Sequence, residues 1–201
     1  MLTPFLSIFY VIIGYLFGSI CSAVIVCRVF SLPDPTTEGS KNPGATNVLR
    51  IAGKKYAIIV LVTDMLKGFL PVLLANLLGA NSTVLGFVCL ASVLGHIYPV
   101  FFNFIGGKGV ATALGALLGF NWILGGLVVL TWLIIALISR YSSLASIISI
   151  VLAPFYCFFL FHNLIACAPL ALITGLVIYK HRSNLSRLMN GTEPKIKLKK
   201  S

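Results

Sequence analysis

Three polar stretches of this sequence contain the residue types that bind phosphate groups. The first, GSKNPGATN at residues 39–47, has Gly39 and Gly44 where the backbone can turn tightly and aim several N–H groups at one anion. The candidate side-chain donors are the polar residues of this run and the arginine after it, namely Ser40, Asn42, Thr46, Asn47 and Arg50. A guanidinium offers a planar fork of donors that suits a phosphate. A turn-rich loop between two helices explains the same composition, so both interpretations stay open.

The second stretch is GGKG at residues 106–109, directly before an apolar segment. If that segment is a helix, its first backbone amides favour negative charge beside Lys108. A Walker A loop is excluded, because Phe102 stands at the position of its first glycine and Gly109 at the position of its Ser or Thr. The alternative is a flexible turn with one lysine.

The third stretch, YKHRSNLSRLMNG at residues 179–191, has the composition of a short basic helix. Helical spacing places His181, Asn184 and Leu188 on one face, with Arg182 and Arg187 nearby. His181 is the most conventional general base among these residues. A helix of this kind also contacts anionic lipid headgroups without any further role.

The segments that position these stretches are apolar enough to lie in a bilayer. Hydrophobic residues make up 59% of the 201 residues, charged residues 9%, and the mean hydropathy is +1.04. We therefore predict an all-α polytopic membrane protein with a single transmembrane domain over residues 1–201. The predicted spans are residues 4–30, 56–78, 83–104, 110–120, 122–139, 143–161 and 163–179.

The distribution of Lys and Arg predicts the orientation of these seven spans. With the N-terminus outside and the C-terminus cytoplasmic, every basic loop lies in the cytoplasm, and the outer turns near residues 79–82, 121 and 162 contain no Lys or Arg. The cytoplasmic residues are then Arg28, Lys41, Arg50, Lys54, Lys55, Lys108, Arg140 and the basic tail from Lys180. The alternative fuses residues 110–139 into one helix and moves Arg140 outside, which breaks this pattern.

Asp64, Lys67 and His96 are ionisable residues inside the predicted spans, and their roles need an explanation. Asp64 and Lys67 are three residues apart on one helix, a spacing that permits an ion pair and reduces the cost of burying each charge. We interpret them as a structural pair rather than as catalytic groups. His96 is a candidate for a functional histidine or a hydrogen-bonded core histidine, and the sequence does not decide between them.

The rest of the composition excludes several kinds of chemistry. The acidic residues are scattered, which argues against two-metal catalysis, and no Ser-His-Asp set is apparent. The five cysteines form no CxxC pair, and we expect them to be small core residues. Lys and Arg lie in loops between apolar spans, so the net charge of +11 indicates orientation signals, and we expect no nucleic acid partner, no metal and no cofactor.

Taken together, these stretches resemble the bacterial acyl-phosphate-dependent glycerol-3-phosphate acyltransferases, a family of polytopic inner-membrane enzymes. The resemblance extends over nearly the whole chain. The motifs that carry it are GSICSA at 18–23, GSKNPGATNVLR at 39–50, DMLKG at 64–68, GHIYPVFFNFIGGKGVAT at 95–112, YSSLASI at 141–147 and HRSNLSRLMNGTE at 181–193.

The resemblance implies seven transmembrane helices, a site facing the cytoplasm, and two substrates, glycerol 3-phosphate and a long-chain acyl phosphate. It implies acyl transfer to the 1-hydroxyl, which gives lysophosphatidic acid and phosphate. By motif match, the phosphate site is lined by Ser40, Asn42, Arg50, Lys108, His181 and Asn184. Among these, Ser40, Lys108 and His181 are the candidate catalytic residues.

Two positions depart from the family pattern. Thr36 stands where the family often has Arg, and Lys41 where it often has Gly. We expect Lys41 to supply the missing loop cation. Before the resemblance is considered, a transporter or channel for a phosphorylated solute explains the same glycine-rich loops and short spans, and it is the rival hypothesis.

Overall fold

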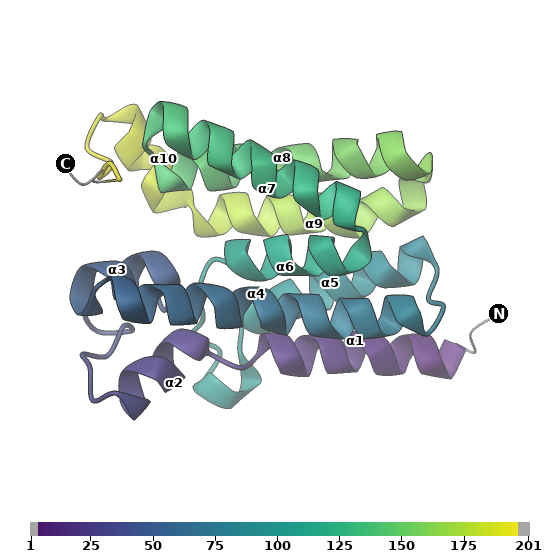
Figure 1. Ribbon diagram of the computed structural model, residues 1–201, viewed down its shortest axis with the longest axis horizontal. Helices are drawn as coiled ribbons and strands as arrows, with labels where there is room; N and C mark the ends of the chain where they lie inside the picture. The colour runs from purple at the N-terminus through teal and green to yellow at the C-terminus, as the bar shows by residue number, and fades with distance from the viewer. Residues whose placement is uncertain (1–3, 197–201) are drawn as a thin grey trace.

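The structure is a computed structural model that describes residues 4–196, and all regular elements in this range are helices (Figure 1). The basic-tail residues Lys197, Lys199 and Lys200 lie outside the described range. The elements are α1 (Pro4–Gly18), α2 (Ser22–Val29), α3 (Ala45–Ala52), α4 (Lys54–Leu77), α5 (Ser82–Ile97), the 3-10 turn η1 (Val100–Phe102), α6 (Val110–Phe120), α7 (Trp122–Ser139), α8 (Ser142–Phe161), α9 (Leu164–Lys180) and α10 (Arg182–Met189).

Five segments are long and apolar enough to cross a membrane: α1 with α2, α4, α5 with η1, α7 and α8. The pair α9 and α10, bent by 60° at its junction, raises this number to as many as six. Helix α6 has 11 residues, which at 1.5 Å per residue is too short to cross by itself. The all-helical fold is confirmed, whereas seven crossings and their orientation stay a prediction.

The alternative of one continuous helix through residues 110–139 is wrong, because the chain turns back at Asn121. This residue is extended, and its side-chain oxygen accepts hydrogen bonds from the backbone N–H groups of Ile123 at 2.9 Å and Leu124 at 3.1 Å. Asparagine is a preferred N-cap because it satisfies free amides at a helix start. Helices α6 and α7 therefore form a hairpin, in which Gly125 packs on the backbone of Leu118.

The first predicted span, residues 4–30, is interrupted in the structure. Helix α1 ends at Gly18 and α2 begins at Ser22, so Ile20 between them lies outside both helices. Its carbonyl oxygen accepts a hydrogen bond from Nζ of Lys67 at 2.7 Å. A break inside an apolar span is tolerated where neighbouring protein groups satisfy the freed backbone.

Helix α6 lies between α4 and α7 and is buried along most of its length (Figure 1). Glycines let α4 approach it closely: an ideal Cβ on Gly68 would lie only 2.1 Å from the carbonyl oxygen of Thr112, and one on Gly115 only 1.9 Å from that of Met65. Such small residues are typical of helix contacts in membranes. This packing fixes the start of α6, where Lys108 stands.

The two ends of the bundle differ in composition. Helices α2, α3 and α10 and the chain near residue 196 lie at one end, and the start of α1 lies at the other (Figure 1). At the end with the start of α1, the helices α5, α7 and α9 begin with the N-capping residues Asn81, Asn121 and Asn163. The three predicted phosphate-binding stretches adjoin α3, the start of α6 and α10. They therefore lie together at the end opposite the start of α1.

Candidate active site

The first stretch, between α2 and α3, is shaped by the side chain of Asn47, which is buried. Its amide nitrogen donates to the carbonyl oxygens of Pro35 and Glu38, each at 3.0 Å, and its oxygen accepts from the backbone N–H of Ser40 at 2.8 Å. Gly39 turns in the left-handed region with φ +62°, directly against the Asn47 side chain. Both amide hydrogens of Asn47 are thus used to hold the loop.

The other predicted residues of this stretch lie around the loop. Thr46 and Arg50 are four residues apart on α3, so they share one helix face, and both are exposed. Ser40 is exposed as well, whereas Asn42 and Gly44 are half-buried. The loop therefore offers a hydroxyl, an amide and a guanidinium at the same end of the bundle.

The second stretch packs against the first. An ideal Cβ on Gly107 would lie 3.0 Å from the carbonyl oxygen of Pro43, which is close contact between the two loops. The N–H of Gly107 donates to the carbonyl oxygen of His96 at 3.1 Å. Gly109, with φ +84°, then starts α6. Lys108 is consequently held between two fixed glycines at the start of a buried helix.

The third stretch begins where α9 bends into α10, and it buries His181 and Asn184. Nδ1 of His181 is 2.8 Å from the carbonyl oxygen of Val177. A carbonyl oxygen only accepts, so Nδ1 carries the hydrogen and Nε2 is the free acceptor of the neutral ring. Burial, together with the charge of Lys108, lowers the pKa of His181 to about 4.

Lys108 joins the second stretch to the third. Its Nζ donates a hydrogen bond to the side-chain oxygen of Asn184. The amide nitrogen of Asn184 donates to Oε1 of Glu193 at 2.7 Å, and Oγ of Ser143 donates to the same oxygen at 2.7 Å. Nε of Arg187 donates to Oε2 at 2.7 Å. Glu193 therefore orients the Asn184 amide so that its oxygen faces Lys108.

The electrostatic field of this cluster is positive. Burial, together with the neighbouring charges of Arg187, Arg50 and Lys180, lowers the pKa of Lys108 to about 8 against the opposing effect of Glu193. Although burial by itself raises the pKa of Glu193, the hydrogen bonds it accepts lower that pKa below its usual value. Four cations around one carboxylate form a site that favours anions.

The structure therefore brings the three stretches together, through the contact of Pro43 with Gly107 and the hydrogen bond of Lys108 with Asn184. Arg50 lies at the same end of the bundle, and its charge contributes to lowering the pKa of Lys108. Within residues 4–196, no described contact joins Ser40 or Thr46 to Lys108 or His181.

A family model described as glycerol-3-phosphate acyltransferase matches residues 8–191 of this chain. A glycerol-3-phosphate acyltransferase of Legionella pneumophila (strain Corby) is 61% identical over 196 residues, which are 98% of this chain and 71% of that protein. The chain belongs to the glycerol-3-phosphate acyltransferase family. A second relative with this name, from Colwellia psychrerythraea, is 50% identical over 191 residues, 95% of this chain and 96% of that protein.

The fold of this acyltransferase is also that of solved structures. The glycerol 3-phosphate form of PlsY (YgiH), an integral membrane glycerol 3-phosphate acyltransferase, superimposes with a TM-score of 0.89 at 43% identity, covering 95% of this chain and 96% of that one. The lysophosphatidic acid form of PlsY gives a TM-score of 0.86 at the same identity, covering 95% of each chain. The predicted family and the predicted multi-pass membrane nature are thereby confirmed.

Sequence reasoning assigned no role to Ser143 and Glu193, and it placed Arg187 only near the site. Glu193 is one of only four acidic residues in the chain, and it comes 12 residues after His181. A single carboxylate in a basic segment was the sequence signal that could have indicated a role for Glu193. Ser143 lies 50 residues from Glu193 in sequence, a separation that no local pattern reveals.

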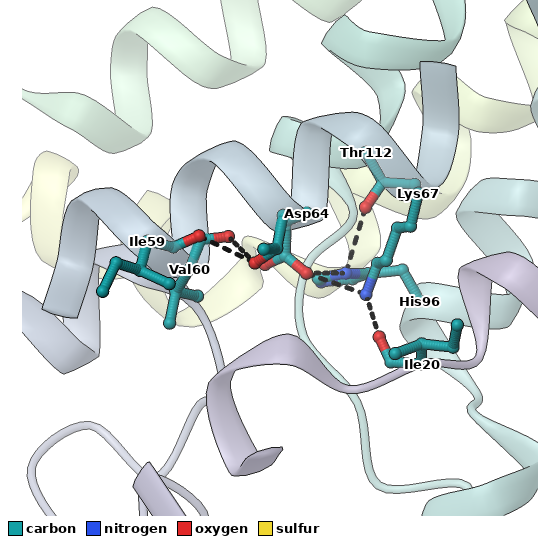
Figure 2. Close-up of polar contacts among 8 residues, drawn as sticks. Ile20, Ile59, Val60, Asp64, Lys67, His96 and Thr112 are labelled. Carbon is teal, nitrogen blue, oxygen red and sulfur yellow. Dashed lines mark hydrogen bonds and ion pairs between the residues drawn. The ribbon is translucent and has the colours of Figure 1, made fainter. Parts of the chain in front are cut away.

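The predicted pairing of Asp64 and Lys67 is present. Nζ of Lys67 lies 2.8 Å from Oδ1 of Asp64, and both side chains are buried (Figure 2). In residues 4–196, no group of three or more His, Cys, Asp or Glu side chains could hold a metal ion.

Proposed function

We propose that this protein transfers a long-chain acyl group from an acyl phosphate to the 1-hydroxyl of glycerol 3-phosphate, giving lysophosphatidic acid and inorganic phosphate in phospholipid synthesis. Membership of the family supports the acyl transfer, and the names of the two PlsY forms supply one substrate and the product. The observation that carries the proposal is the contact of Lys108 with Asn184, because it unites the Gly-rich loop with the α10 segment in one cationic site.

Both proposed substrates carry a phosphate, which explains why the site gathers several cations. Arg50, Lys108, His181 and Asn184 hold the two phosphate groups in this proposal. The Ser40 hydroxyl and those backbone N–H groups of residues 39–47 that are not bonded inside the loop donate to the charge that develops on the acyl phosphate. The side chain of Asn47 acts indirectly, because its hydrogen bonds hold the backbone of this loop in place.

The reaction proceeds by direct transfer. The 1-hydroxyl oxygen attacks the carbonyl carbon, the bond from that carbon to the phosphate oxygen breaks, and its electron pair leaves with the phosphate. The acyl phosphate is already activated, so no acyl-enzyme nucleophile is needed, and positioning two anions side by side lowers the barrier. The apolar helices house the acyl chain.

The hydroxyl proton passes either to Nε2 of His181 or to a phosphate oxygen of a substrate. A pKa of about 4 makes His181 a weak base in the empty site. A bound phosphate dianion offsets the charge of Lys108 and raises that pKa, which improves the base. If His181 is the base, His181→Asn depresses kcat much more than KM; a variant that raises only KM assigns the imidazole to binding.

The proposed setting is the bacterial inner membrane, with seven crossings, the N-terminus outside and the site facing the cytoplasm. Two observations support it. The described basic residues Arg50, Lys108, Arg140, Lys180 and Arg187 adjoin the loops at the end that holds α3 and α10, and the start of α1 lies at the other end (Figure 1). An odd number of crossings separates the ends of the chain in this way.

Phosphate release by the purified protein in detergent tests the proposal. Palmitoyl phosphate alone should give no release, and addition of glycerol 3-phosphate should start it. Lys108→Ala should abolish this release, and Lys54→Ala, which removes a charge from an exposed position, should retain it. Phosphate release without glycerol 3-phosphate, or none with it, contradicts the proposal; a transporter would give the second result, because detergent leaves no membrane to cross.

A further inference from the structure

A second polar cluster lies among α4, α5 and α6 (Figure 2). Its members, with their exposed fractions, are Asp64 at 2%, Lys67 at 5%, His96 at 6% and Thr112 at 0%. Burying charged groups inside a membrane protein is costly, so such a cluster needs a reason.

The imidazole of His96 is fixed on one side by this cluster. Nδ1 is 3.1 Å from Oγ1 of Thr112 and 3.6 Å from Oδ1 of Asp64. Asp64 is in turn held by Nζ of Lys67 at 2.8 Å, and the same Nζ donates to the carbonyl oxygen of Ile20 at 2.7 Å. Groups from α4, from α6 and from the break between α1 and α2 thus determine the ring orientation.

The opposite edge of the ring supports the phosphate-binding loops. An ideal Cβ on Gly107 would lie 2.2 Å from Nε2 of His96, and one on Gly106 would lie 2.1 Å from its carbonyl oxygen. The same Gly107 position is 3.0 Å from the carbonyl oxygen of Pro43 in the first loop. The imidazole therefore packs directly on the backbone beside Lys108, where the two loops meet.

We propose that His96 is a positioning residue for the acyl transfer. Its ring, aligned by Thr112 and the Asp64–Lys67 pair, supports the backbone of the Gly106–Gly109 loop and thereby fixes the position of Lys108. This inference rests on the proposed function. A displacement of about 1 Å in a group that orients a substrate reduces rates greatly. A well-aligned ring beside Gly107 prevents such a displacement. This role gives a reason for burying the polar groups that align the ring.

Thr112→Val tests this role, since it removes the hydroxyl that contacts His96 and keeps the shape of the side chain. Thr112→Ser is the matched control because it keeps the hydroxyl. We expect Thr112→Val to raise KM for glycerol 3-phosphate about three- to tenfold, the effect of one hydrogen bond, and Thr112→Ser to stay near wild type. KM does not depend on how much enzyme is folded, so a merely structural role would leave it unchanged.

A wild-type KM in Thr112→Val overturns the inference. If that variant fails to fold, Gly107→Ala decides instead, measured in the wild type and in a His96→Asn background that lacks the ring edge facing Gly107. We expect Gly107→Ala to raise KM clearly less in the His96→Asn background, and equal effects in both backgrounds overturn the inference. The proposed function is tested separately by the transfer activity of the wild-type protein. If the wild type is active, the KM values of these variants test only the role of His96.

Discussion

Glu193→Gln is the substitution whose effect the structure defines most fully. The glutamate accepts hydrogen bonds from Ser143 and Asn184 on one oxygen and from Arg187 on the other, each at 2.7 Å. A glutamine oxygen can still accept from Ser143 and Asn184. Its NH2 group then faces Nε of Arg187, which is also a donor, so this ion pair is lost.

The magnitude follows from these three bonds. The bond to Arg187 contributes about 1 kcal/mol, at the low end for charged groups because that side chain is 40% exposed. The other two weaken by about 1 kcal/mol each when the acceptor becomes neutral. The free energy of unfolding should therefore fall by about 3 kcal/mol, which lowers Tm by about 6–12 °C for a chain of this size.

The assay combines thermal unfolding in detergent with steady-state kinetics. We expect Glu193→Gln to lower Tm and also to raise KM for glycerol 3-phosphate, because the Asn184 amide no longer holds its oxygen toward Lys108. Glu38→Gln is the matched control, since it removes the same charge from an exposed residue. A Glu193→Gln protein with the Tm and KM of the wild type would refute this reasoning about the carboxylate.

Three further predictions concern the loops and the packing. Since the pKa of Lys108 is about 8, kcat/KM for glycerol 3-phosphate should fall as pH rises above about 8, and Lys108→Arg should lack this fall because arginine stays protonated; identical pH profiles would contradict the pKa. Lys41→Ala should raise KM for glycerol 3-phosphate about two- to fivefold, as expected for an exposed cation, with Lys54→Ala as control; an unchanged KM removes Lys41 from the site. Gly68→Ala should destabilise the protein by about 1–3 kcal/mol in thermal unfolding, whereas Gly175→Ala, with open space around it, should not; equal Tm values would contradict the close packing of α4 on α6.

Sequence alone predicted the long helices well because hydropathy and turn chemistry are local. The predicted spans 110–120 and 122–139 match α6 and α7 at both ends. Asn121 explains this agreement, since a single residue ends one apolar segment and caps the next. The break at Ile20 was not predicted, because Ser-Ile-Cys is as apolar as its surroundings and the interruption depends on Lys67, 47 residues away.

For the candidate site, the sequence indicated the three polar stretches but not the contacts between them. The three polar stretches were recognised, and the structure places them at one end of the bundle through contacts at Gly107 and Lys108. The role of Asn47 in shaping the loop was not foreseen, because an amide that binds a ligand and one that binds backbone look alike in sequence. Glu193 and Ser143 act through long-range contacts, which require the fold.

The most direct test of the acyl transfer itself is the stoichiometry of the two products. Purified protein in detergent, given palmitoyl phosphate and glycerol 3-phosphate, should form lysophosphatidic acid, measured by mass spectrometry, and inorganic phosphate in equal amounts. Formation of phosphate without the lipid would contradict the account, because the acyl group would then have passed to water instead of to glycerol 3-phosphate.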